Sequence, residues 1–228
     1  MMETEPETDG KGVLDAQRLQ WERTFEEPNA FGVNPSFPAQ QAAALFKREG
    51  VTELLELGGG QGRDTLFFAG NGFRVHVADY SDRAIEAISE KSRSLGLADS
   101  IIAGTADVRK PLPFAGKQFD ACYSHMLYCM ALTTPELEAL SREIRRVLKP
   151  GGLNIYTVRN TTDAHYKTGI HRGEDMYEVG GYIVHFFSRE KIQHLAQGYD
   201  VVSIEDFQEG GLPRRLFLVT LRKKGASE

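Results

Sequence analysis

The chain has 228 residues, a formal net charge of -5 and a sequence pI of about 5.8. Its 41% hydrophobic and 26% charged residues are typical of a folded globular protein and exclude a disordered or fibrous chain. The acidic balance gives no overall attraction to polyanions, so we expect no nucleic-acid partner. Two cysteines, Cys122 and Cys129, do not indicate a disulfide framework, and no apolar run is long enough for a membrane span. We therefore expect a cytoplasmic protein without a membrane partner, and the composition leaves its oligomeric state open.

The N-terminal part is expected to contain a tail followed by two helices. Residues 1–11 are acidic and lack an apolar pattern, which predicts a mobile tail. Apolar residues between Val13 and Phe25 fit one or two helical turns, and 38–46 fits a second helix with a proline near its start. We expect a single domain over 12–228, of which 12–50 holds these helices.

Strands and helices alternate through the rest of the chain. We expect parallel strands at 52–57, 74–79, 100–104, 119–123 and 153–158, and a C-terminal pair at 200–206 and 216–221. This pattern predicts an α/β fold, doubly wound, with a seven-stranded and mostly parallel sheet that ends in an antiparallel hairpin. Within it, 51–158 is the core, 159–187 is a long polar insertion without expected regular structure, and 188–228 is a helix followed by the hairpin.

A glycine-rich turn follows the first expected strand. Glycines stand at Gly58, Gly60 and Gly62, and such a turn lets backbone N–H groups approach a ligand closely. A dinucleotide fingerprint that starts at Gly58 needs a glycine at position 63, which is Arg63, and no Gly-Lys-Ser/Thr sequence marks a phosphate loop. The turn therefore suits a ligand with an adenosine but no pyrophosphate.

Five sequence motifs occur in a characteristic order: ELGGGQG, VADYS, TADV, FDACYS and LKPGGLNIY. Together they resemble the motif series of class I S-adenosylmethionine-dependent methyltransferases, over roughly Thr52 to Val158. The resemblance implies a Rossmann-like fold and S-adenosylmethionine as cofactor. It assigns cofactor binding to the residues that match the motifs, namely Glu56, Gly58, Gly60, Gly62, Asp79, Tyr80, Asp107, Val108 and Ser124.

Three of these positions carry specific expectations. Asp79 ends the second expected strand about twenty residues after the glycines, where a carboxylate accepts hydrogen bonds from ribose hydroxyls, although a role in the turn is the alternative. By the resemblance, Asp107 reads the adenine edge unless it is a plain surface residue. Glu56 holds the glycine loop and the methionine end of the cofactor unless it is purely structural.

The methyl acceptor is expected to be a small molecule. Methyl transfer from a sulfonium is an in-line displacement that depends on alignment, and a base is needed only if the nucleophile arrives protonated. The acidic charge, the long insertion and the sequence YSHMLYCM, which replaces the Asn/Asp-Pro-Pro-aromatic motif of base-amine and glutamine methylation, all favour a small acceptor. The alternatives are an RNA or protein methyltransferase, and a non-catalytic regulatory protein that binds S-adenosylmethionine.

Three residues are candidates for contact with the acceptor. His125 follows the fourth strand, and with Tyr166 it is placed to orient a nucleophile or take its proton. Arg159 anchors an anionic group, or instead pairs with Asp163 on the surface. Around Arg159 and His185 the chain also shows a weaker similarity to tellurite-resistance and thiopurine-type methyltransferases. No compact Cys or His spacing indicates a metal site.

The aromatic residues that precede the first strand allow two interpretations. They are Trp21, Phe25, Phe31 and Phe37. They either face the sulfonium as part of a segment that closes over the site, or pack the N-terminal helices onto the sheet.

Overall fold

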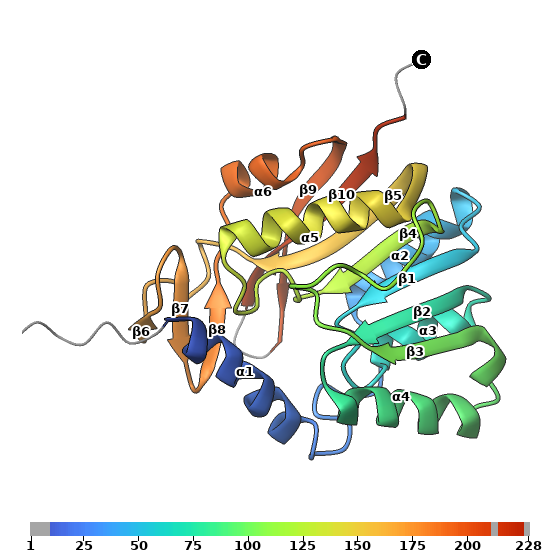
Figure 1. Cartoon of the computed structure of the whole chain (residues 1–228), viewed down its shortest axis with the longest axis horizontal. Coiled ribbons are helices and arrows are strands. Elements are labelled where there is room, and N and C mark those ends of the chain that lie inside the picture. The colour runs from blue at the N-terminus through green and yellow to red at the C-terminus, as the bar shows by residue number, and fades with distance from the viewer. Residues whose placement is uncertain (1–9, 211–213, 226–228) are drawn as a thin grey trace, which may run out of the picture.

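The computed structural model describes residues 10–210 and 214–225 of the chain (Figure 1). Its main feature is a seven-stranded sheet in the order β3-β2-β1-β4-β5-β10-β9. The strands are β1 (Glu53–Leu57), β2 (Arg74–Asp79), β3 (Ile101–Thr105), β4 (Phe119–His125), β5 (Leu148–Arg159), β9 (Tyr199–Glu209) and β10 (Arg214–Lys223). The predicted α/β fold with a seven-stranded, mostly parallel sheet is confirmed.

Strand direction decides which residues share an edge of this sheet. Strands β1 to β5 pair in parallel, whereas β10 is antiparallel to both of its neighbours, β5 and β9. The predicted hairpin is therefore present, with β10 inserted between β5 and β9. Because β9 is antiparallel to β10, it runs in the same direction as β1 to β5. The last residue of β9 consequently lies at the same edge of the sheet as the carboxyl ends of the parallel strands.

Helices cover both faces of the sheet. One face packs against α2 (Phe37–Arg48), α3 (Arg63–Gly70) and α4 (Asp82–Ser94), and the other packs against α5 (Thr134–Val147) and α6 (Arg189–Leu195). Local sequence explains where these helices start. Ser81 caps α4 by accepting a hydrogen bond from the Ala84 N–H, and Thr133 forms a capping box with Glu136 at the start of α5. A single-turn 3-10 helix, η1 (Ala98–Ser100), leads into β3.

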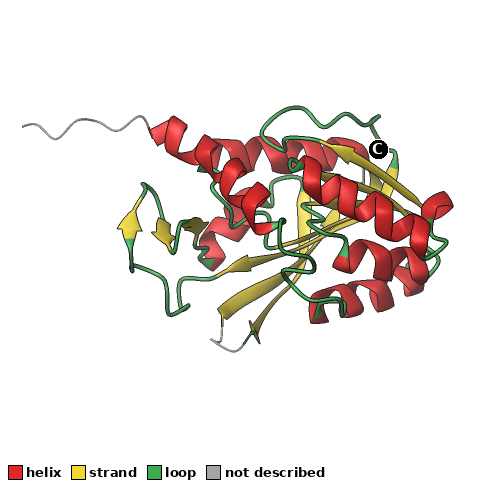
Figure 2. Ribbon diagram, turned by 90° about the horizontal axis from the view of Figure 1, so that it is seen from below, coloured by secondary structure: helices red, strands yellow, loops and turns green. Residues whose placement is uncertain are grey.

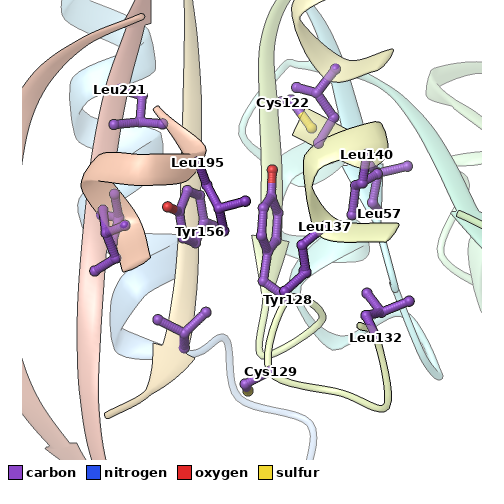
Figure 3. Packing of buried hydrophobic residues seen from close by; sticks show 14 of the residues in the cluster. Leu57, Cys122, Tyr128, Cys129, Leu132, Leu137, Leu140, Tyr156, Leu195 and Leu221 are labelled. Carbon is purple, nitrogen blue, oxygen red and sulfur yellow. The ribbon is translucent and has the colours of Figure 1, made fainter. Parts of the chain in front are cut away.

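The core under α5 and α6 contains closely packed aromatic rings (Figure 3). Tyr128 and Tyr156 stack with their ring centroids 4.1 Å apart and their planes 9° from parallel. Cys122 and Cys129 lie in the same cluster as buried, free thiols. This packing holds β4 and β5 on the face of the sheet that α5 and α6 cover. The carboxyl ends of these two strands form part of the candidate site.

The insertion after β5 has regular structure, contrary to our expectation. It forms a small antiparallel sheet of β6 (Ile170–His171), β7 (Met176–Val179) and β8 (Tyr182–His185), which Figure 2 shows apart from the main sheet. Strands β7 and β8 flank Gly180 and Gly181, which have φ angles of 61° and 84°. Two residues with positive φ are what a tight hairpin turn requires, so a Gly-Gly between two short apolar runs was the signal for this hairpin.

The N-terminal helix α1 (Gly10–Thr24) lies beside the small sheet and near α4 (Figure 1). Residues 1–9 of the predicted tail lie outside the described residues, and the last two residues of that tail begin α1. The helix predicted at 38–46 is α2, which is one to two residues longer at each end. Among the described residues, no helix is long and apolar enough to cross a membrane.

Candidate active site

The glycine loop between β1 and α3 has the backbone conformation that the sequence required. Gly58, Gly60 and Gly62 all have positive φ, at 73°, 52° and 87°. A Cβ atom on Gly62 would lie 2.8 Å from Ile88 Cγ1, so packing on α4 also excludes a side chain there. Gly60 instead faces the ring of Phe25, the residue that follows α1 by one position. The N-terminal segment therefore covers the exposed face of the loop.

Asp79, at the end of β2, organises the loop. Its carboxylate accepts hydrogen bonds from the Gly60 N–H at 2.9 Å and from the Ser81 N–H at 3.0 Å, one on each oxygen. Burial raises the pKa of Asp79, although these backbone donors oppose the shift. A carboxylate has about four lone-pair positions, so each oxygen keeps one for a further donor. Two adjacent ribose hydroxyls would supply that pair of donors.

A second buried carboxylate, Glu56, lies at the base of the same loop. Its Oε2 is among the buried polar atoms that have no hydrogen-bond partner in the described part of the chain. Burial raises the pKa of Glu56 to about 8, and the nearby carboxylates of Asp64 and Asp79 add to this. Glu56 is therefore held largely protonated near neutral pH, and a positive charge placed beside it would favour its ionised form.

Asp64 joins the helices that border the site. Its carboxylate accepts hydrogen bonds from the Ser36 N–H at 2.8 Å and the Ser36 hydroxyl at 2.7 Å, and from the Tyr123 hydroxyl at 3.2 Å. Ser36 also caps α2. This buried cluster fixes the start of α2 against the start of α3 and against β4.

The remaining predicted cofactor residues lie at the carboxyl ends of β2, β3 and β4. Tyr80 is half-buried next to Asp79, and Val108 is partly buried at the edge of the core. Both carboxylate oxygens of Asp107 are held by Arg109, with the closest contact at 2.9 Å from Nη2. The Ser124 hydroxyl is buried and has no hydrogen-bond partner among the described residues. The structure thus brings these residues to one edge but leaves their predicted roles as proposals.

His125 lies at this edge between two partners that the sequence did not suggest. Its Nδ1 is 3.0 Å from the Thr157 hydroxyl at the end of β5, and its Nε2 is 3.1 Å from Glu209 Oε2 at the end of β9. The Thr157 oxygen also accepts a hydrogen bond from the Met126 N–H at 2.9 Å. Three strands that share a direction therefore bring one polar cluster together.

Arg159 and Tyr166 are engaged within the insertion. Arg159 is buried and pairs with Asp163 through two guanidinium nitrogens, and its guanidinium lies 5.3 Å from the centre of the Phe186 ring. The predicted pairing with Asp163 is present, although it is buried and not on the surface. The Tyr166 hydroxyl donates to Asp175 Oδ1 at 2.8 Å, and that bond with the burial raises the pKa of Tyr166 to about 12. Arg159 and Tyr166 therefore have partners within the insertion and are not free side chains beside His125.

Helix α1 connects the glycine loop to the small sheet. The Gln17 side chain donates to the Gly181 carbonyl at 3.1 Å and accepts from the Ile183 N–H at 3.0 Å, both in β8 or its turn. At its other end, Glu22 accepts hydrogen bonds from the Ser81 hydroxyl and the Asp82 N–H, both at 3.0 Å. The helix therefore spans the carboxyl edge of the sheet.

The leading aromatic residues divide between two places. Trp21 contacts Phe25, Phe31 and Tyr182, with ring centroids 5.8, 6.0 and 5.1 Å away. Phe37 instead contacts Phe207 of β9 at 6.3 Å. Three of the four thus lie in the segment over the glycine loop, and the fourth lies near the end of β9.

Comparison with known proteins supports one interpretation of this edge. Residues 54–152 match the family described as a methyltransferase domain. The chain is 29% identical over 158 residues to a sterol 4-C-methyltransferase of Caenorhabditis elegans, in an alignment that covers 66% of this chain and 45% of the worm protein. Residues 54–152 therefore carry the sequence features of a class I S-adenosylmethionine-dependent methyltransferase domain.

Solved structures show how widely this methyltransferase fold is shared. A Burkholderia thailandensis 1,6-didemethyltoxoflavin-N1-methyltransferase superposes with a TM-score of 0.74 at 15% identity, over 97% of this chain and 93% of that one. The [4+2]-cyclase SpnF superposes with a TM-score of 0.68 at 18% identity, over 93% and 96% of the two chains. The chain spans about half the length, or less, of the curated relatives it matches. These likenesses support the fold alone.

The residues at this edge of the sheet fit S-adenosylmethionine. Asp79 has free lone pairs for ribose hydroxyls. Glu56 Oε2 and Ser124 Oγ are buried polar atoms without a hydrogen-bond partner among the described residues. A Cβ atom on Gly60 would lie 3.6 Å from the Phe25 ring, so the N-terminal segment packs against the glycine loop. Among the described residues, no group of three or more His, Cys, Asp or Glu side chains is placed to hold a metal ion.

Besides Thr157 and Asp64, three contributors to the site were not predicted. Gln17 and Glu22 lie on α1, and their polar contacts are with residues far along the chain. Glu209 is the last residue of β9 and lies beyond the strand expected at 200–206. No local sequence signal marks Glu209, because the direction of β9 depends on β10 lying between β5 and β9.

Proposed function

We propose that the protein transfers a methyl group from S-adenosylmethionine to a small-molecule acceptor at the carboxyl edge of the main sheet. The observation that carries this proposal is that α1 and Phe25 cover that edge, and we call this cover the roof. Helix α1 is hydrogen-bonded to the small sheet through Gln17 and to α4 through Glu22, and the ring of Phe25 lies over Gly60. A roofed site suits a small molecule better than an RNA or a folded protein.

The cofactor is proposed to lie across the ends of β1, β2 and β3. The residues that hold it in this proposal are Glu56, Gly58, Gly60, Gly62, Asp79, Tyr80, Asp107, Val108 and Ser124. When bound, S-adenosylmethionine supplies a methyl group on a positively charged sulfur. Asp79 accepts the ribose hydroxyls, the glycine loop allows the ligand to approach the backbone, and Glu56 offers a carboxyl group to the positively charged end.

The acceptor is proposed to lie next to His125, at the ends of β4, β5 and β9. The main contribution of the protein is to align the nucleophile, the methyl carbon and the sulfur while the roof excludes water. Arg159 supports this part of the site through its buried pair with Asp163, and Tyr166 supports it through Asp175. We further propose the cytoplasm as the place of action, because the buried free thiols Cys122 and Cys129 suit a reducing compartment.

A cofactor-turnover assay tests this function. Formation of S-adenosylhomocysteine is measured with a panel of small amines, alcohols, thiols, carboxylic acids and metalloid oxyanions, beside tRNA and a peptide mixture. We expect turnover with a small compound. Turnover confined to tRNA or peptides would contradict the proposal, and cofactor binding without turnover of any acceptor would favour a regulatory protein.

A further inference from the structure

On the basis of the proposed function, the polar cluster of His125, Thr157 and Glu209 limits which class of compound can be the methyl acceptor. Glu209 and Phe207 point to the same face of β9, because side chains alternate along a strand. This is the face that packs against α2, as Phe207 contacts both the core there and Phe37 at the start of that helix. A carboxylate and an exposed aromatic ring therefore lie on the same side of the carboxyl edge.

Both ring nitrogens of His125 are engaged, which limits what this histidine does. Nδ1 faces Thr157, a residue with no exposed surface, so the acceptor has no access to Nδ1. Because the ionised carboxylate of Glu209 only accepts hydrogen bonds, Nε2 donates to it. In the neutral ring Nδ1 then accepts from the Thr157 hydroxyl, whose oxygen also accepts the Met126 N–H. His125 is a positioning residue in this arrangement, and the group left to meet the acceptor is the carboxylate of Glu209.

The charges around Glu209 keep it ionised. Burial raises the pKa of Glu209, but the hydrogen bond from His125 and the charges of Arg63 and Arg214 oppose this effect, and the pKa is lowered overall. Arg63 also forms an ion pair with Asp64, from Nε to Oδ1 at 3.3 Å, and its Nη1 donates to the Phe31 carbonyl at 3.1 Å. Only Oε2 of Glu209 has a hydrogen-bond partner among the described side chains, so Oε1 is a hydrogen-bond acceptor that is free to receive a donor.

We propose that Glu209 Oε1 binds the N–H or O–H of the methyl acceptor, which is therefore an amine or a hydroxyl compound with an apolar body that packs against Phe37 and Phe207. Phe37 is 54% exposed, so it is available for such a contact. A thiolate, a carboxylate or a metalloid oxyanion would bring a negative charge to a carboxylate and is disfavoured.

The proton and the electron pairs balance in the resulting step. The lone pair of the acceptor nitrogen or oxygen forms the new bond to the methyl carbon as the carbon–sulfur bond breaks and its electrons return to sulfur. The proton of the acceptor passes to Glu209 Oε1 and then to water. The positive charge of the sulfonium and the negative charge of the carboxylate are both neutralised in this exchange.

Glu205 provides a matched control for Glu209. It lies on the same face of β9, four positions earlier, and is exposed. The first measurement is calorimetric binding of 2-phenylethylamine and of phenylacetate, which share an aromatic body and differ in charge, each with S-adenosylhomocysteine present. We expect the wild type and Glu205→Gln to bind the amine at least about tenfold more tightly than the carboxylate, and Glu209→Gln to lose this preference. Tighter binding of phenylacetate, or binding of neither compound, would overturn the proposal.

The second measurement uses an acceptor that the turnover panel identifies. We expect Glu209→Gln to lower kcat/KM for the acceptor by about 100-fold, within the range for a positioned base, with affinity for S-adenosylhomocysteine unchanged. His125→Asn should have a smaller effect and move the acidic limb of the pH–rate profile upward, because Glu209 loses a group that lowers its pKa. If Glu209→Gln matches the wild type in turnover, the inference fails while the proposed function stands. If the wild type binds no S-adenosylhomocysteine, the proposed function itself fails.

Discussion

The two halves of the site are built in different ways. In the cofactor half, the contact between Gly60 and Asp79 joins residues 19 positions apart, and that between Asp79 and Ser81 joins residues two apart. In the acceptor half, Glu209 meets His125 across 84 positions, and Gln17 meets Gly181 across 164. The cofactor half is thus encoded locally, whereas the acceptor half exists only once the whole sheet and its roof have formed.

The largest expected effect is on the stability of the acceptor half. Arg159→Ala leaves the buried carboxylate of Asp163 without its guanidinium, and breaking a buried pair costs about 3–5 kcal/mol. The partly exposed pair of Arg172 and Glu178 is the control, where Arg172→Ala should cost about 1 kcal/mol or less. Denaturant unfolding measures both. Equal losses would show that Arg159 is not a structural residue and would revive its role as an anchor for an anionic acceptor.

A smaller effect is expected in the cofactor half. Asp79→Asn removes the negative charge that accepts the ribose hydroxyls, and charge-assisted hydrogen bonds contribute about 1.5–3 kcal/mol. The dissociation constant for S-adenosylmethionine should therefore rise about 10-fold to 100-fold in calorimetry. Asp82→Asn, three positions later and exposed, should bind as the wild type does. An unchanged affinity in Asp79→Asn would mean that the ribose lies elsewhere.

The difference between the halves explains which site residues could be predicted from the sequence and which could not. The glycine spacing and Asp79 mark the cofactor half because each of these contacts joins residues no more than 19 positions apart. Glu209 could not be recognised, because its role depends on β10 entering between β5 and β9 and so setting the direction of β9. The small sheet was missed for another reason. The polar residues of the insertion suggested a loop, although Gly180 and Gly181 between two short strands indicated a hairpin.

The roof links the two halves, and Gln17 tests this link. Gln17→Ala leaves the Gly181 carbonyl and the Ile183 N–H without partners, which should weaken docking of α1 by about 1–3 kcal/mol. Amide hydrogen exchange should accelerate in α1 and at the start of β8, and remain unchanged in β1 and β2. Gln41→Ala, at an exposed position of α2, is the control. Unchanged exchange in α1 would show that this helix is held by other contacts.

The smallest expected effect is the release of a proton from Glu56 when the cofactor binds. The pKa of Glu56 is about 8 in the folded protein against an ordinary value of 4.5, so its contribution to stability is full below pH 4.5 and is lost as the pH rises toward 8. Binding of the positively charged cofactor should favour the carboxylate and release up to one proton at pH 7. Calorimetry in buffers of different ionisation enthalpy measures this release.

Glu56→Gln provides the comparison for that measurement. It should release no proton on binding, and it should lose the decline in stability between pH 4.5 and 8. Proton release of equal size in the variant and the wild type would assign the proton to another group.

The meeting of the two halves at one edge is tested most directly by a crystal structure of the protein with S-adenosylhomocysteine. We expect both ribose hydroxyls within hydrogen-bonding distance of the Asp79 carboxylate, and the sulfur directed toward His125 and Glu209. A ribose bound away from Asp79, or a sulfur that faces Asp107 and the end of β3, would contradict the account.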